Sequence, residues 1–157
     1  MPLIEEWDGQ SWSVVSTPNL DTNSLTSVSC LTSTDCWAVG GGSGYVDTDG
    51  ALTAHWNGQS WSVVPARGSG RAEDVLDGIE CVSESQCVAT GATQDKDGQN
   101  PETLIESWNG SAWRTIQSGI TNDSPGSTLE GVTCTSDQCW TVGEQDNLRT
   151  LIEQAAP

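Results

Sequence analysis

Tryptophans and cysteines recur along this chain with a common period. The tryptophans include three close pairs whose first members lie 49 and then 52 residues apart. These pairs are Trp7/Trp12, Trp56/Trp61 and Trp108/Trp113. The cysteines keep the same spacing, as Cys30/Cys36, Cys81/Cys87 and Cys134/Cys139. Two independent residue types with one period indicate internal repeats, and repeats of about 40–50 residues with strand-like content are typical of propellers and related arrays.

Each repeat contains four segments with the composition of β-strands. In the second repeat they lie at residues 77–81, 87–91, 103–108 and 113–116, and we name them strands A, B, C and D. They are rich in Val, Ile, Thr and Trp and show no helical spacing, which favours a pleated, half-buried sheet. Asn109-Gly110 between strands C and D is a strong hairpin signal, because both residues accept a positive φ. The sequence therefore predicts an all-β fold.

The strand count shows that the chain begins and ends inside a repeat. It opens with strand C at residues 3–7, followed by strand D, and it closes with strand C at residues 150–153. Strands A, B and D therefore occur three times and strand C four times. At 157 residues, a single repeat domain over 1–157 is expected. Its repeats span about 3–50, 51–103 and 104–154, with the terminal strand duplicated.

Six cysteines allow 15 disulfide pairings, and the repeat favours one of them. Each pair flanks the short turn between strands A and B, which places the two Cβ atoms opposite each other in a hairpin. We therefore expect the disulfides 30–36, 81–87 and 134–139. The alternative is zinc, but C-x5-C, C-x5-C and C-x4-C spacing with His55 as the only histidine departs from the tighter spacing of structural zinc sites. Disulfides imply an oxidising compartment, so an extracellular or secreted protein is expected.

The charge and the composition exclude several classes of binding partner. The net charge is −17, which would repel nucleic-acid phosphates and anionic membrane surfaces. No stretch is apolar enough to insert into a membrane, and residues 1–5 lack the basic start and apolar run of a signal peptide. Hydrophobic residues make up only 34% and phenylalanine is absent, so the tryptophans are expected in the core.

The repeat pattern resembles two known groups of proteins. It reads L-x-x-V-x-C-x5-C-W-A-V-G, then an aliphatic strand, then W-[ND]-G-x-x-W. This is similar to repetitive, secreted bacterial proteins with Cys-paired C-W-A-V-G repeats. More distantly, it resembles the Asp-box β-propellers of sialidases and photosystem-assembly factors. The matching segments are residues 37–40 and 140–143 and the turns Asp8-Gly9, Asn57-Gly58 and Asn109-Gly110. The resemblance implies that these turns are structural. Repeat two departs from the pattern with Val88 in place of Trp, and two of the turns carry Asn in place of Asp.

The implied fold is a set of β-propeller blades, and this has a consequence for assembly. A propeller closes with about 4–8 blades, so three repeats cannot close a ring alone. Two chains would give six blades, so a homodimer of half-propellers is expected. The N-terminal C and D strands of one chain could complete the C-terminal A and B strands of the other, which leaves one copy of strand C redundant. The alternative fold is a β-trefoil, which also has three repeats of four strands and often binds sugars.

The expected function is a non-catalytic extracellular binding or scaffold module. Its ligand would be a glycan or a protein. The binding site is expected on the long, variable loops, which lie at about 16–26, 41–51, 65–77, 92–102 and 117–129. A lectin-like carbohydrate-binding domain is the alternative. A sialidase-like glycosidase fragment is a weaker one, because Tyr45 is the only tyrosine and the arginines fall at unrelated repeat positions. His55 occupies a strand C position and is expected to be an exposed residue, not a base.

One motif points to a metal ion. Asp47 and Asp49 precede Gly50, and Asp95 and Asp97 precede Gly98, so the D-x-D-G pattern occurs twice. This is half of a calcium loop, in which alternate carboxylates point one way and glycine permits the turn. The later bidentate acid is missing at the usual spacing, so a polar turn is the alternative. No other cofactor is expected.

Overall fold

The computed structural model describes residues 2–18, 24–41, 50–70, 73–95, 99–120, 126–145 and 149–155. Within these ranges the chain forms thirteen β-strands, which confirms the all-β class. They are β1 Ile4–Trp7, β2 Trp12–Val15, β3 Ser24–Thr32, β4 Asp35–Gly41, β5 Ala51–Trp56, β6 Trp61–Val63, β7 Glu73–Ser83, β8 Gln86–Gln94, β9 Glu102–Trp108, β10 Trp113–Ile116, β11 Thr128–Cys134, β12 Cys139–Gln145 and β13 Arg149–Ala155. No helix in this part of the chain has the length and apolar character needed to cross a membrane.

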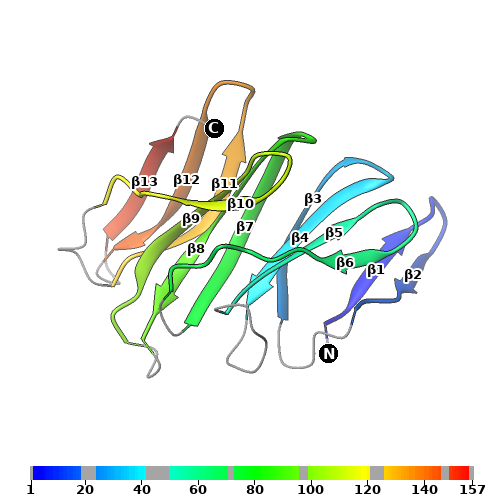
Figure 1. Ribbon diagram of the computed structural model, residues 1–157, viewed down its shortest axis with the longest axis horizontal. Helices are drawn as coiled ribbons and strands as arrows, with labels where there is room; N and C mark the ends of the chain where they lie inside the picture. The colour runs from blue at the N-terminus through cyan, green and yellow to red at the C-terminus, as the bar shows by residue number, and fades with distance from the viewer. Residues whose placement is uncertain are drawn as a thin grey trace.

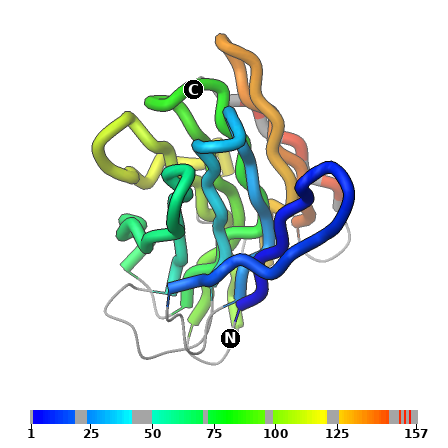
Figure 2. Tube along the Cα trace, turned by 90° about the vertical axis from the view of Figure 1, so that its right-hand side faces the viewer, coloured from blue at the N-terminus to red at the C-terminus, as the bar shows by residue number. Residues whose placement is uncertain are grey.

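The strands form three sheets, of two, eight and three strands, and the eight-stranded sheet divides into two antiparallel groups of four that are joined where β4 meets β7. The resulting four groups follow one another in chain order, in an arrangement that we call the fan (Figure 1). We call β1–β2 the N-terminal hairpin, β3–β6 unit 1, β7–β10 unit 2 and the three-stranded β11–β13 unit 3. Within each group, neighbours in sequence are neighbours in the sheet. Units 1 and 2 join through a single residue pair, Gly41 and Val75, between β4 and β7. Figure 2 views the fan from the end formed by the N-terminal hairpin, drawn in blue.

Each unit begins with a hairpin that carries a disulfide. The two half-cystines are direct cross-strand partners in all three hairpins. The bonds join Cys30 to Cys36, Cys81 to Cys87 and Cys134 to Cys139. No cysteine is free, so the zinc alternative has no thiolate to use. In units 1 and 2 the hairpin strands run beyond the segments of strong β propensity, because β-bulges let the pairing continue past an irregular residue.

The glycine four residues after the cysteine of strand B is required by a close approach of two strands. A Cβ on Gly40, Gly91 or Gly143 would lie 1.9–2.0 Å from a carbonyl oxygen of the preceding strand. Each glycine faces a leucine, after which the register of the pairing shifts by one residue. Because no side chain fits there, glycine lets strands A and B stay paired beside the bulge.

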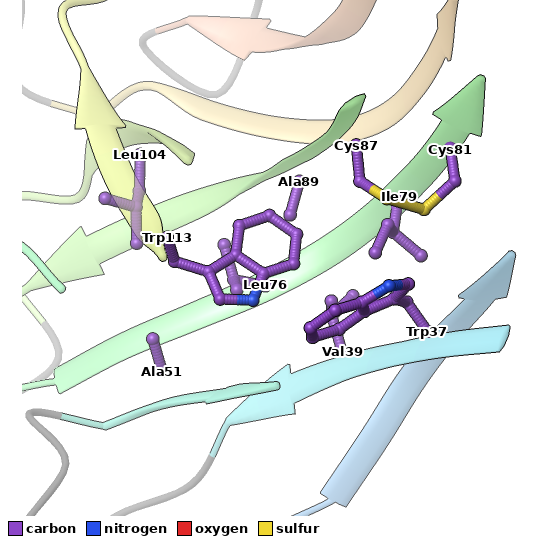
Figure 3. Close-up of a cluster of buried hydrophobic side chains, with 10 residues drawn as sticks. All are labelled: Trp37, Val39, Ala51, Leu76, Ile79, Cys81, Cys87, Ala89, Leu104 and Trp113. Carbon is purple, nitrogen blue, oxygen red and sulfur yellow. A yellow bond between two sulfur atoms is a disulfide. The ribbon is translucent and has the colours of Figure 1, made fainter. Parts of the chain in front are cut away.

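The core lies between the units. We call the side of a unit that faces the next unit its front face, and the opposite side its back face. Figure 3 shows the cluster between the front of unit 1 and the back of unit 2: Trp37, Val39, Ala51, Leu76, Ile79, Cys81, Cys87, Ala89, Leu104 and Trp113. Trp37 is 3% exposed, and its ring centroid lies 4.7 Å from Trp108 and 5.3 Å from Trp113. A second cluster joins Val88 and Ile105 of unit 2 to Leu129 and Cys139 of unit 3. Burying one tryptophan of about 150–250 Å² contributes at most about 4–6 kcal/mol.

Candidate functional site

A groove of about 530 Å³ separates the N-terminal hairpin from unit 1. It lies between elements that are consecutive in the chain, and both sides contribute to its walls. The hairpin supplies residues 3–7 and Val15, and unit 1 supplies residues 25–28, Cys30, Thr32, Ser33, Cys36, Ala38, Trp56 and Trp61. These residues are mostly apolar, so the groove is chiefly a hydrophobic surface with acidic residues on the hairpin side.

Strand β1 runs along the groove, because residues 3–7 all line it. Among the described strands, β1 pairs only with β2, so its second edge carries backbone N–H and C=O groups without a strand partner. An unpaired strand edge is a template for adding another strand.

The floor of the groove is the back face of unit 1, and it has a covered counterpart in unit 2. Val28 faces Ala38 across β3 and β4 just as Ile79 faces Ala89 across β7 and β8. The same register matches six groove residues with six core residues of unit 2: Leu25 with Leu76, Val28 with Ile79, Cys30 with Cys81, Cys36 with Cys87, Ala38 with Ala89 and Trp61 with Trp113. Val28 is 60% exposed but Ile79 only 5%, because unit 1 covers the back of unit 2.

The opposite end of the fan carries a second uncovered surface. Trp140 and Val142 on β12 hold the positions that Trp37 and Val39 hold on β4. Their exposed fractions are 44% and 47%, against 3% and 0% for the two unit 1 residues. Ile152 of β13 is 61% exposed on the same sheet. The front face of unit 3 is thus built to pack against a back face and has none in the described chain.

The expectation that all tryptophans lie in the core is therefore wrong for three of them. Trp7, Trp12 and Trp140 are 49%, 65% and 44% exposed. They carry the same motifs as the buried tryptophans but belong to the first and last elements of the fan. Their exposure arises because no neighbouring unit covers them.

The three W-[ND]-G turns share one geometry. In each, a side-chain oxygen accepts hydrogen bonds from the backbone N–H groups two and three residues later, at 2.7–3.0 Å. The acceptors are Asp8, Asn57 and Asn109, and the glycines Gly9, Gly58 and Gly110 have φ values of 101°, 87° and 88°. Carboxylate and amide oxygens accept equally well here, which explains why Asp and Asn interchange. The bonds from Ser11 and Gln10 lower the pKa of the exposed Asp8.

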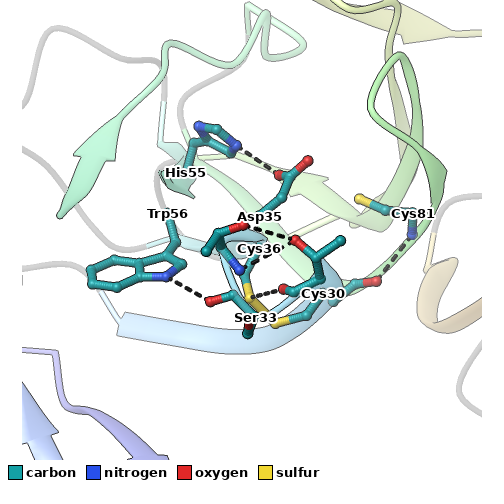
Figure 4. Close-up of a disulfide and its surroundings, with 10 residues drawn as sticks. Cys30, Ser33, Asp35, Cys36, His55, Trp56 and Cys81 are labelled. Atoms are coloured by element: carbon teal, nitrogen blue, oxygen red, sulfur yellow. Dashed lines mark hydrogen bonds and ion pairs between the residues drawn. A yellow bond between two sulfur atoms is a disulfide. The ribbon is translucent and has the colours of Figure 1, made fainter. Parts of the chain in front are cut away.

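In units 1 and 2 the end of strand C closes over the hairpin formed by strands A and B. The indole N–H of Trp56 donates to the carbonyl oxygen of Ser33 at 3.2 Å (Figure 4), and that of Trp108 donates to Glu84 at 3.1 Å. The turn glycine that follows lies against the same hairpin. A Cβ on Gly58 would lie 2.9 Å from Thr34.

The N-terminal hairpin has the same parts but no hairpin to close over. Within the described residues the indole N–H of Trp7 has no acceptor, and a Cβ on Gly9 would meet nothing within 4 Å. Its turn nevertheless has the same hydrogen bonds as the other two. The hairpin therefore has the form of the outer half of a unit, and no counterpart of strands A and B pairs with it among the described strands.

Two buried carboxylates anchor the segment that links units 1 and 2, and sequence reasoning missed both. Glu106 is fully buried, and its carboxylate accepts from Gly68 N at 2.5 Å and Arg67 N at 3.2 Å. Burial raises the pKa of Glu106, although these backbone bonds oppose the rise. Asp74, also fully buried, accepts from the N–H and the hydroxyl of Ser69, both at 2.6 Å. The signal in the sequence was the repeated Leu-Ile-Glu triplet, which places an acid inside strand C.

His55 is half-buried, whereas it was expected to be exposed. Its Nε2 lies 2.8 Å from Asp35 Oδ1 (Figure 4), and its ring stacks 4.6 Å from that of Trp37. The imidazole therefore helps to hold Trp37 against unit 2. This is a packing role at the interface between the two units.

Three of the four predicted calcium residues, Asp47, Asp49 and Asp97, lie outside the described residues. Tyr45, the only tyrosine, also lies outside them. Asp95 lies in a turn where its N–H donates to Gln99 and its carboxylate accepts from Asn100, both at 3.2 Å. The described residues contain no group of three or more potential metal ligands. Calcium binding stays a prediction.

Comparison with solved structures adds a structural likeness. No protein-family model matches the sequence, and no curated protein matches it. A solved structure described as YCF48 bound to D1 peptide aligns with 95% of this chain and 60% of its own, at 16% sequence identity and a TM-score of 0.37. The chain therefore spans less than two thirds of that protein's length.

Proposed function

We propose that the chain is a non-catalytic, extracellular propeller-like module that binds an extended polypeptide segment in the groove between the N-terminal hairpin and unit 1. Units 1 and 2 are four-stranded antiparallel meanders with a shared hydrophobic core between them, and this arrangement supports propeller blades over the alternative β-trefoil. Three disulfides fit an oxidising compartment.

The free edge of β1 beside an apolar floor is the observation that supports this function. An added strand would hydrogen-bond to the backbone of β1, and its alternate side chains would enter the floor formed by Val28, Ala38 and Trp61. Main-chain hydrogen bonds supply affinity in this mode, and the pockets for side chains supply specificity.

The dimensions and charge of the groove define the ligand. A strand rises about 3.3 Å per residue, so residues 3–7 span roughly 13–17 Å and would pair with about five residues of a ligand. Glu5 and Glu6 lie on the rim, and the chain carries a net charge of −17. We therefore expect a preference for segments with apolar residues toward the floor and neutral or basic residues toward the rim.

A peptide titration tests the proposal. Ten-residue peptides with alternating apolar and lysine residues are added at the lowest chain concentration that tryptophan emission permits. Binding should shift the emission to the blue, because Trp7 and Trp61 line the groove and would lose water. Val28→Arg should abolish the shift by filling the floor. Ser62→Arg on β6, exposed and outside the groove, is the matched control and should bind as the parent does.

Two results would contradict this function. One is a peptide response that Val28→Arg leaves unchanged, because the site would then lie elsewhere. The other is binding of neutral oligosaccharides with no binding of any peptide, which would favour the lectin-like alternative.

A further inference from the structure

We propose that the segment bound in the groove is β11–β12 of a second copy of this chain, and that β1 of the first copy takes the place of the second copy's β13. This rests on the proposed function, since it names the polypeptide that the groove receives.

The floor of the groove has a partner of the right shape on the same molecule. In the interface between units 1 and 2, Trp37 and Val39 belong to the same buried cluster as the six back-face residues that correspond to the groove floor. Trp140 and Val142 are their counterparts on β12 and lie uncovered at the other end of the fan. The front of unit 3 in one copy therefore matches the groove floor in another as unit 1 matches unit 2.

The free edge of β1 could pair with β12 of a second copy in the register that β13 now has. Residues 3–5 and 151–153 are both Leu-Ile-Glu, so β1 and β13 are copies of the same strand. In units 1 and 2 the half-cystine of strand B faces a tryptophan of strand C, as Cys36 faces Trp56. In unit 3, Cys139 faces Ala155. If β1 replaced β13 in this register, Trp7 would face Cys139 and restore the pattern.

Exchange of the two strands would also complete the missing contacts. The indole N–H of Trp7 would reach the turn at residues 135–138, as Trp56 and Trp108 reach the equivalent turns of units 1 and 2. Gly9 would lie against that turn, where it now meets nothing. β2 would follow as the fourth strand, which unit 3 lacks. β13 offers none of these contacts, so the exchanged arrangement is favoured.

The exchange is reciprocal, and it closes the two copies into a ring. Each copy gives its N-terminal hairpin to the other copy's β11–β12, so two copies form two composite units in addition to their own units 1 and 2. The result is a ring of six four-stranded units with twofold symmetry, in which both uncovered faces are buried.

A matched pair of proline variants tests the exchange. Proline removes a backbone donor and cannot continue a ladder. Light scattering on the parent chain should give twice the chain mass of 16.6 kDa. Ile4→Pro should reduce this to a single chain mass. Ile152→Pro, in the identical triplet of β13, should keep the dimer and lower its dissociation constant, because it weakens the competing strand.

Two results would overturn the proposal: a monomeric parent chain, or an Ile152→Pro variant that dissociates as Ile4→Pro does. If the monomeric parent chain still bound the alternating peptides, the proposed function would stand and only the second copy would be excluded. If it bound none, both would fail.

A cysteine cross-link provides a test that does not depend on proline. In the exchanged register Ile4 faces Val142, as Ile152 does in the single chain. Ile4→Cys and Val142→Cys variants, mixed under denaturing conditions without reductant and refolded together, should form a covalent heterodimer. Each variant alone should remain unlinked, because the exchanged register then places the introduced cysteine opposite Val142 or Ile4, and not opposite a second introduced cysteine. Equal linkage in the single-variant samples, or none in the mixture, would contradict the exchange.

Discussion

Replacing Glu106 by glutamine should flatten the pH dependence of stability. Glu106 is fully buried between units 1 and 2, and burial raises its pKa in the folded protein. The folded state therefore binds the proton more tightly than the unfolded state, in which the pKa has its ordinary value near 4.5. The contribution to stability is complete below that value and is lost as the pH rises through the raised pKa.

The magnitude follows from linkage. Within this window the free energy of unfolding of the parent chain should fall by up to about 1.4 kcal/mol per pH unit through this residue alone. Glu106→Gln does not titrate, so it lacks this slope. The N–H groups of Gly68 and Arg67 donate to different oxygens of Glu106, and glutamine replaces one of these oxygens by an NH2 group that cannot accept. The lost hydrogen bond lowers stability by about 1–3 kcal/mol at all pH values.

The assay is chemical denaturation followed by tryptophan emission, between pH 4 and pH 8. Glu84→Gln is the control, because it removes the same charge from an exposed turn. The advantage of the parent chain over Glu106→Gln should shrink as the pH rises, while its difference from Glu84→Gln stays nearly constant. An advantage that grows with pH would refute the reasoning, since it would mean that the two backbone N–H groups outweigh burial and depress the pKa.

Three further predictions use the same denaturation assay. Gly91→Ala should destabilise the fold by about 1–3 kcal/mol or more, because its Cβ would lie 2.0 Å from a carbonyl oxygen. Gly131→Ala, whose Cβ would have its nearest neighbour at 3.5 Å, should change stability little, and equal effects of the two variants would contradict the close-approach argument. Asp8→Asn should be nearly neutral, since an amide oxygen makes the same turn at Asn57 and Asn109, whereas Asp8→Ala should lower the denaturation midpoint because two backbone N–H groups lose their acceptor. A large loss in Asp8→Asn would show that the charge matters. Replacing Cys81 and Cys87 together by serine should cost about 2 kcal/mol, and no loss of stability would show that the unfolded chain is not constrained by this bond.

Local features of the fold could be predicted from the sequence because they depend on neighbours in the chain. Asn109-Gly110 marks a hairpin through its own backbone preferences, and Cys81 and Cys87 face each other because one short turn separates them. The alternation of Val, Ile and Thr predicts the strands for the same reason. These signals need no knowledge of what packs against the strand.

The packing between units could not be predicted in this way. Trp37 and Trp140 follow a cysteine in the same motif, yet one is 3% and the other 44% exposed. The difference lies in what covers each face, and the motif carries no information about it. Glu106 is similar: its triplet is the same as that of Glu5, but only Glu106 meets the backbone of a preceding unit. The groove was missed because it depends on how the N-terminal hairpin lies against unit 1, and the motifs of the two carry no information about that.

The placement of the disulfides affects how such a chain can change in evolution. Each bond joins residues only five or six positions apart, inside one hairpin. Loops this short close readily, so each bridge can form without reference to the rest of the chain. Duplication or loss of a whole repeat therefore leaves no cysteine without its mate. Descendants of one repeat could differ in array length while every copy oxidises correctly, and selection could then act on the faces between units independently of the covalent links within them.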